Sequence, residues 1–218
     1  MTEKDPYQTS IEAVWHDPTS YDPMKHAPPY MPRTASLTRN DRTSIRKWAS
    51  SQVSSQVVRR IVGSVAPLSS LLAVLRAGVF IHHTHHWQTR GGHYYADHLL
   101  FERLYTESEP FVDQVGERAV GSGNIALVDP IPQVQKMSQL VGLLAGADRS
   151  PEALVTSSLS TETLILSVID EVRSLLEGSG ALSNGTDNLL QGIADAHEVF
   201  VYLLKQRAAQ PSVYDYGR

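Results

Sequence analysis

Apolar residues recur at three- and four-residue steps through most of this chain, and this helical period constrains the fold more than any other feature. No stretch alternates apolar and polar residues for long, so we expect no sheet. Long helices are expected from about residue 57 to the Arg90-Gly91-Gly92 break, and over residues 94–120, 151–177 and 186–207. Four long helices with one long crossover, between the second and the third, predict an all-α four-helix bundle.

Prolines and glycines refine this prediction. Pro67 and Gly78 interrupt the first long helix, so we expect it to be kinked or broken. Pro110 lies inside the second helix and should bend it. The crossover over residues 124–150 should contain a short helix near residues 134–144.

The first forty residues differ from the rest. Six prolines and three tyrosines, with few aliphatic residues, fall within residues 1–33 and predict an extended segment. The domain prediction is therefore an extended Pro/Tyr-rich arm over residues 1–40, a bundle over 41–210 and a tail over 211–218. The arm begins acidic, whereas residues 33–60 are basic. A solvated helix face explains such a charge run, and an anionic partner such as nucleic acid is the alternative.

Composition restricts the chemistry. The chain has no cysteine, so a metal ion would be bound by histidine, carboxylate or water. A net charge of -4 does not require nucleic acid or a membrane as partner. No apolar run approaches the roughly 20 residues of a membrane span, and the N-terminus does not resemble a secretory signal. We expect a cytoplasmic protein, with association with a virion or the nucleoid left open.

Four polar residues lie on nearly one face of the second helix: His98, Glu102, Asp113 and Glu117. Glu102 and Asp113 are eleven residues apart, roughly 16 Å along a helix, so one helix cannot bring both pairs to one ion. Two antiparallel copies of the helix would give two identical sites in a two-fold dimer. The alternative is ordinary surface charge paired along the helix.

A histidine run ends the first long helix. His82, His83, His85 and His86 fall within five residues and are followed by Trp87. Such a concentration favours metal or proton chemistry. His82 and His83 are secondary candidates for metal ligands. Together with His85, they either create a second metal position or line the entrance to the metal site.

These residues resemble a known family pattern. His86-Trp87, a short loop with glycine, His98-x3-Glu102 and Asp113-x3-Glu117-Arg118 fit the Dps family of ferritin-like mini-ferritins over about 38 residues without a gap. The resemblance implies a ferritin-like four-helix bundle. It also implies ferroxidase ligands His86, His98 and Glu102 from one subunit, Asp113 and Glu117 from its two-fold mate, and Trp87 beside the site.

The resemblance further implies oxidation of Fe(II) by peroxide or dioxygen and storage of ferric mineral in a hollow dodecamer, with manganese or zinc possible at the same site. The acidic arm predicts weak DNA binding. A different class of function is a structural, scaffold or virion-associated protein with little turnover, anchored through its arm. A third hypothesis places a di-metal site inside one subunit; it would use Glu162, Asp195, His197 and Glu198.

Overall fold

The computed structural model describes residues 37–63 and 66–209, and every regular element within them is helical. The predicted extended arm lies outside the described residues except for its last four positions, and the whole of the predicted tail lies outside them. In chain order the elements are α2 (Arg39–Gln52), α3 (Ser55–Val62), α4 (Pro67–Gln88), α5 (Tyr94–Gly121), the 3-10 helix η1 (Ile125–Val128), α6 (Pro130–Leu144), α7 (Pro151–Gly178) and α8 (Asn184–Ala208).

Local sequence explains where the long helices begin and end. The Ser150 hydroxyl accepts from the Ala153 amide at the start of α7, and the Ser183 hydroxyl accepts from the Thr186 amide at the start of α8. These side chains satisfy amides that have no partner within the helix. Gly180 follows α7 at a positive φ of 70°, a conformation that favours glycine, and turns the chain into α8.

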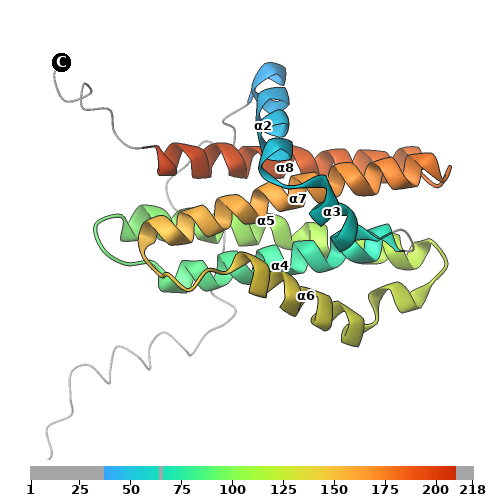
Figure 1. The fold of residues 1–218 in the computed structure, drawn as a ribbon, viewed down its shortest axis with the longest axis horizontal. Coiled ribbons are helices and arrows are strands. Elements are labelled where there is room, and N and C mark those ends of the chain that lie inside the picture. The colour runs from blue at the N-terminus through green and yellow to red at the C-terminus, as the bar shows by residue number, and fades with distance from the viewer. Residues whose placement is uncertain (1–36, 64–65, 210–218) are drawn as a thin grey trace, which may run out of the picture. The chain divides into compact units, whose positions relative to one another are not determined.

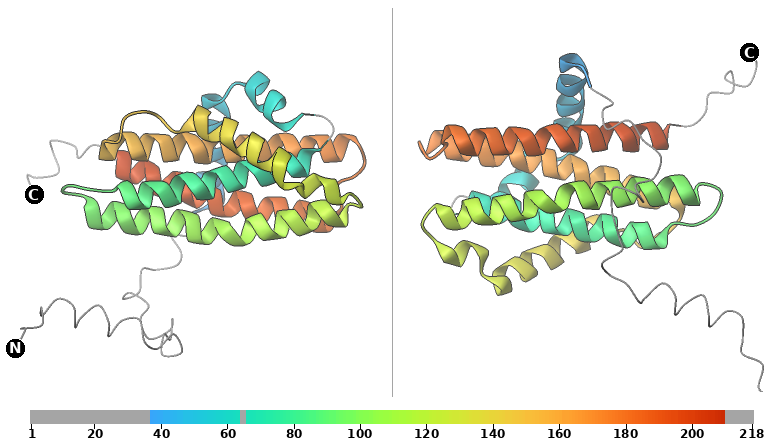
Figure 2. Two further views of the ribbon diagram at one scale, coloured as in Figure 1. Left: turned by 90° about the horizontal axis from the view of Figure 1, so that it is seen from below. Right: turned by 180° about the vertical axis from the view of Figure 1, so that it is seen from behind.

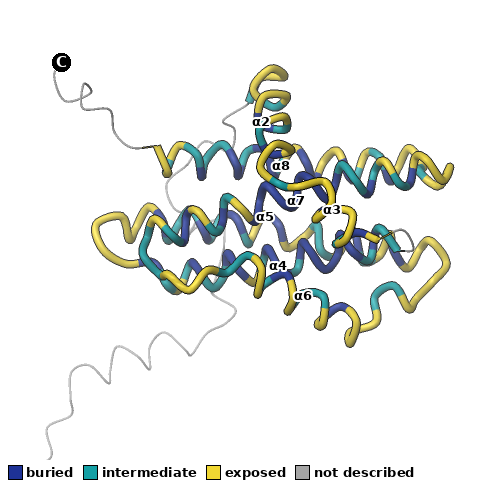
Figure 3. Tube along the Cα trace, viewed as in Figure 1, coloured by how far each residue is buried: buried dark blue, intermediate teal, exposed yellow. Residues whose placement is uncertain are grey.

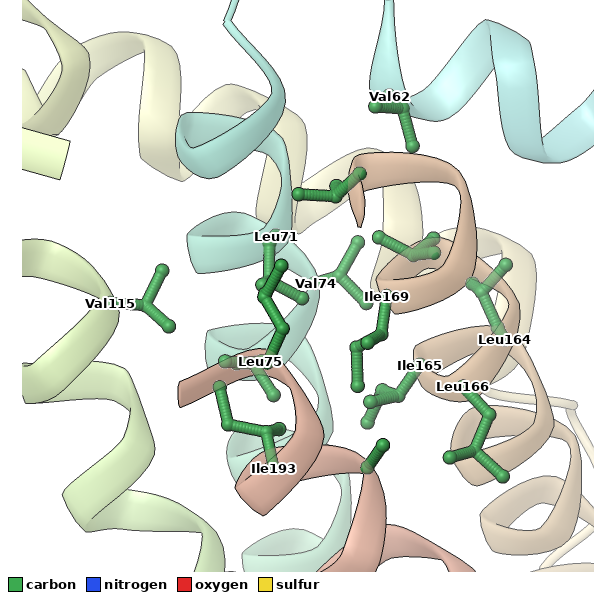
Figure 4. Packing of buried hydrophobic residues seen from close by; sticks show 14 of the residues in the cluster. Val62, Leu71, Val74, Leu75, Val115, Leu164, Ile165, Leu166, Ile169 and Ile193 are labelled. Carbon is green, nitrogen blue, oxygen red and sulfur yellow. The ribbon is translucent and has the colours of Figure 1, made fainter. Parts of the chain in front are cut away.

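The helices α4, α5, α7 and α8 form a four-helix bundle built from two hairpins (Figures 1 and 2). Helix α4 pairs with α5, α7 pairs with α8, and α4 packs against α7 across the centre. The buried positions follow the bundle interior while the outer faces are exposed (Figure 3). Leu71, Leu75, Ile165, Ile169 and Ile193 interdigitate between three of the helices (Figure 4). The fold is therefore the all-α four-helix bundle that the helical period predicts, and it agrees with the ferritin-like bundle that the resemblance implies.

The first predicted long helix is two helices. Helix α3 ends at Val62 and α4 begins at Pro67, so the predicted break occurs there. Gly78, by contrast, lies within a continuous α4. Its role is close packing, since a Cβ at this position would lie 2.9 Å from Ile165 Cδ1 on α7. Helix α5 likewise continues through Pro110.

Helix α6 covers one side of α4 in the crossover, where the sequence predicts a short helix (Figure 2). Its Gln133 side chain donates to the Ser69 carbonyl at 3.0 Å, and its Lys136 ammonium donates to the Ser70 hydroxyl at 2.6 Å. These contacts fix the crossover against the bundle.

Helix α2 crosses α7 and α8 on the outside of the bundle (Figure 1). Only Ile45 and Ala49 of this helix are buried. Arg42 forms an ion pair with Asp195, and Arg46 Nε lies 2.5 Å from a carboxylate oxygen of Glu198. Ion pairs thus supplement a small apolar contact.

One helix of the described chain, α7, is long and apolar enough by itself to cross a membrane. Two thirds of its apolar window is buried inside the bundle, however, as expected for the core helix of a globular protein.

Candidate functional site

The α4–α5 hairpin brings His86 and His98 together. Helix α4 ends at Gln88, the chain turns at Gly91 with a φ of 80°, and α5 begins at Tyr94. The two imidazole rings then stack, with centroids 3.6 Å apart and planes 24° from parallel. Residues twelve apart in the sequence therefore form one pair of half-buried imidazoles.

Reciprocal hydrogen bonds orient these two rings. The Nδ1 of His86 lies 3.0 Å from the His98 carbonyl, and the Nδ1 of His98 lies 3.1 Å from the His86 carbonyl. Because a carbonyl only accepts, each Nδ1 carries the hydrogen and each Nε2 keeps its lone pair. This is the pattern that orients imidazoles around metals, with one nitrogen tied to the protein and the other free to bind.

Glu102 lies one helical turn beyond His98 on α5 and is half-buried. Tyr105 follows it, with its ring 4.3 Å from His83 and edge-on to His86 at 5.5 Å. Burial first, and then the neighbouring Glu102 and Glu109 carboxylates, raise the pKa of the Tyr105 hydroxyl. This end of the hairpin therefore combines two imidazoles and a carboxylate with a neutral phenol.

Asp113 and Glu117 lie in the distal half of α5 and are exposed. Eleven residues of continuous helix separate Asp113 from Glu102, roughly 16 Å along the axis. The structure thus gathers His86 and His98 but keeps the second carboxylate pair apart within one chain. Across the described residues, no group of three or more His, Asp or Glu side chains is arranged to hold a metal ion.

Exposed aromatic side chains surround the first half of the predicted site. Trp87 is 68% exposed, and its ring lies 4.2 Å from His83. Tyr94 is also largely exposed and stacks on His98, with centroids 5.2 Å apart. Such large apolar surfaces around a polar pair are typical of an interface with another protein surface.

The remaining histidines of the run separate into two groups. His83 stays with the aromatic cluster beside His86. His82 and His85 turn into the bundle, where they are 0% and 5% exposed. Burial, followed by the nearby His82 and Arg149, lowers the pKa of His85 to about 3, so this ring is neutral.

Inside the bundle, Glu162 of α7 joins two histidines. One carboxylate oxygen lies 2.6 Å from His82 Nε2 of α4, and the other lies 2.5 Å from His197 Nδ1 of α8. Burial acts to raise the pKa of Glu162, but the charge and hydrogen bonds of His197 and the hydrogen bond from His82 lower it to about 2. All three side chains are 0% exposed.

The hypothesis of a di-metal site inside one subunit grouped four residues that the structure divides into two pairs. Glu162 and His197 are brought together, whereas Asp195 and Glu198 face the arginines of α2. Sequence reasoning missed the link from Glu162 to His82. The histidine run and the polar residues on the apolar helices α7 and α8 were the available signals.

No protein-family model matches the chain. Among curated proteins, it is 24% identical over 152 residues to DNA protection during starvation protein 2 of Bacillus anthracis, covering 69% of this chain and 94% of that protein. It is 26% identical over 128 residues to the nutrient stress-induced DNA-binding protein of Synechococcus sp., covering 58% and 69%.

Two solved structures share the fold. DpsC from Streptomyces coelicolor is 19% identical with a TM-score of 0.58, and the match covers 83% of this chain and 92% of that one. Dps from Thermosynechococcus elongatus is 17% identical with a TM-score of 0.53, covering 80% and 98%. The chain is thus similar in sequence to two starvation- and stress-induced proteins, and it shares the ferritin-like bundle fold of two Dps structures.

Proposed function

We propose that the protein is a mini-ferritin that oxidises Fe(II), with peroxide or dioxygen as oxidant, at sites formed between two subunits. The observation that carries this proposal is the oriented imidazole pair of His86 and His98, with Glu102 one helical turn beyond His98 on α5. Neutral imidazole and ionised carboxylate are ligands suited to iron, and also to manganese or zinc.

The partner half comes from a second copy of the chain. Asp113 and Glu117 are exposed and cannot reach the imidazole pair of their own chain along a continuous α5. An antiparallel two-fold dimer would place them against His86, His98 and Glu102 of the mate. The exposed Trp87 and its aromatic neighbours would be covered in the same interface. Six such dimers would make a dodecameric shell able to hold ferric mineral, and the proposed location of this shell is the cytoplasm.

His82 is left out of this proposed ligand set. Its ring is fully buried, and both of its nitrogens are hydrogen-bonded within the bundle. His83 stacks on Tyr105 and contacts Trp87, so we assign it to the aromatic surroundings of the iron site.

DNA binding is a second candidate function, because both curated relatives carry DNA in their names. Three of the six described basic residues that precede α4 form ion pairs in this chain. Arg42 and Arg46 of α2 pair with carboxylates on α8, and Arg59 of α3 lies 3.7 Å from Glu171. We therefore propose that any duplex binding is weak and salt-sensitive.

Complementation between two inactive variants tests the shared site. Glu102→Ala and Glu117→Ala would each damage both sites of a homodimer. In a mixed dimer, one site takes Glu102 from the Glu117→Ala chain and Glu117 from the Glu102→Ala chain, so it is intact. The other site lacks both carboxylates. Random pairing makes about half of the dimers mixed, so roughly a quarter of wild-type Fe(II) oxidation should return on co-expression.

The matched control is Glu152→Ala, which removes an exposed carboxylate from α7 and should leave oxidation unchanged. Mass spectrometry must confirm that mixed dimers formed. Confirmed mixing without any recovery would exclude a site shared between subunits. Light scattering should show a particle near twelve times 24.1 kDa, whereas a monomer at micromolar concentration would contradict the assembly.

A further inference from the structure

The first turn of α5 has few contacts that fix it to the bundle. Its N-cap residue, His93, makes no capping bond through its side chain in the described part of the chain. Between residues 90 and 100, all of which the structure describes, Asp97 is the only buried residue. The start of a helix is usually fixed by a capping side chain or by an apolar residue packed beside it. At the start of α5 a buried carboxylate has this role instead.

One guanidinium binds this carboxylate. The Nε and Nη2 atoms of Arg207 donate to the two carboxylate oxygens of Asp97 at 2.6 and 2.9 Å. Arg207 lies in the last turn of α8, so the bond joins the start of α5 to the end of α8. The two side chains are only 2% and 18% exposed. Two parallel bonds between a guanidinium and a carboxylate fix orientation as well as distance, so the pair restricts how the first turn of α5 can move.

Asp97 directly precedes His98, whose ring is half of the candidate iron site. Consecutive Cα atoms are about 3.8 Å apart, so a shift of Asp97 is passed on to His98. The ring of His98 lies against that of His86, with centroids 3.6 Å apart, and its Nδ1 lies 3.1 Å from the His86 carbonyl. Its other stacking partner, Tyr94, is largely exposed. The orientation of this ring therefore depends on where the first turn of α5 is held.

We propose that Asp97 and Arg207 are positioning residues of the candidate iron site, and that their ion pair keeps His98 stacked on His86. Neither residue is proposed as a ligand. Outer partners that orient a ligand contribute to metal affinity, because a ring that is already oriented does not have to be ordered when the ion binds. The inference rests on the proposed function for the meaning of the site, but the position of the ring can be measured without metal.

Diethyl pyrocarbonate, which acylates a free imidazole nitrogen, reports on His98 in the metal-free, full-length protein. Peptide mass spectrometry gives the rate for each histidine. Asp97→Asn keeps the size of the side chain but removes its charge, and it should speed the modification of His98 roughly threefold or more. The exposed His93 should react as in wild type. The matched control is Asp187→Asn, which breaks the 2.7 Å bond to Arg173 between α7 and α8 and should leave the His98 rate unchanged. Equal His98 rates in Asp97→Asn and wild type would overturn the proposal.

A leucine pair separates positioning from stability. Replacing a buried ion pair by apolar residues often preserves stability, but apolar contact is not directional. Asp97→Leu/Arg207→Leu should therefore resemble wild type in urea denaturation and still show fast modification of His98. Wild-type stability together with a wild-type His98 rate would show that the ion pair only stabilises the fold. If the leucine variant does not fold, the comparison of Asp97→Asn with Asp187→Asn decides the question by itself.

Cobalt(II), used alone as the probe, tests the consequence for metal binding. The relevant signal is the Co(II) absorption that His98→Ala abolishes. Asp97→Asn should weaken this binding about tenfold, and Asp187→Asn should stay within about twofold of wild type. Binding by wild type that Asp97→Asn leaves unchanged would overturn the positioning role. Wild-type protein without such a signal, but with the expected His98 rates, would instead contradict the iron site and leave the role of the ion pair standing.

Discussion

Replacing Glu162 with glutamine tests how the bundle tolerates a buried carboxylate. Glutamine keeps the size and one hydrogen-bond acceptor of a protonated glutamic acid but cannot ionise. In the native protein the carboxylate accepts from His82 and His197 inside a fully buried cluster. We expect Glu162→Gln to fold and to be less stable at neutral pH, because two imidazoles then face an uncharged amide.

The pKa of Glu162 gives the size and the pH range of the effect. Its carboxyl has an ordinary pKa of 4.5, which the folded protein lowers to about 2. This difference corresponds to about 3 kcal/mol in the free energy of unfolding. Because the folded pKa is depressed, the stabilisation is complete above pH 4.5 and is lost as the pH falls toward 2.

Urea denaturation followed by circular dichroism, from pH 7 downward and with a chelator present, measures this difference. The two proteins should differ by about 3 kcal/mol at pH 7 and converge in acid. Glu152→Gln, exposed on the same helix, should stay within about 0.5 kcal/mol of wild type. A difference that does not change with pH would show that packing, rather than the charge of Glu162, produces it, and equal stability at pH 7 would refute the argument.

Other contacts predict measurable changes. Gly78→Ala should destabilise the protein by about 1–3 kcal/mol in urea, because its Cβ would meet Ile165 Cδ1 at 2.9 Å; adding Ile165→Val, which removes that atom, should recover part of the loss. Arg207→Ala should cost about 3 kcal/mol, because it leaves the buried Asp97 carboxylate without its two bonds of 2.6 and 2.9 Å, and a urea midpoint equal to wild type would contradict this. Since arginines of α2 pair with carboxylates of α8, no gel shift of duplex DNA is expected at physiological salt, and tight binding there would show that these arginines are available.

Local sequence signals were sufficient for the long helices. The helix predicted over residues 94–120 is Tyr94–Gly121 in the structure, since glycines precede it and follow it. Helix α2 was not predicted, because it buries only two residues and so carries no apolar stripe. Its position depends on ion pairs with α7 and α8, which are more than a hundred residues away in the sequence. Contacts of that kind have no local pattern.

The candidate iron site likewise depends partly on contacts that no local sequence pattern predicts. Spacing along one helix predicted that His98 and Glu102 share a face and that Asp113 lies too far away to join them. The stacking of His98 on His86 and the exchange of their carbonyl hydrogen bonds depend on how the hairpin closes. No sequence period encodes that closure, because the Gly91 turn and the packing of α4 on α5 set it together.

The concentration of histidines in this run did not by itself show which histidines face the bundle interior and which face the candidate iron site. On an α-helix, residues three apart lie 60° from one another, so His82 and His85 form one stripe and His83 and His86 form another, about 100° away. The first stripe faces the bundle interior and meets Ser158, whereas the second faces the aromatic side chains of α5. One five-residue stretch of α4 therefore contributes imidazoles to two separate clusters. Substitutions in one stripe should leave the hydrogen bonds of the other intact, so the candidate iron site at His86 can be altered without breaking the buried contact between His82 and Glu162.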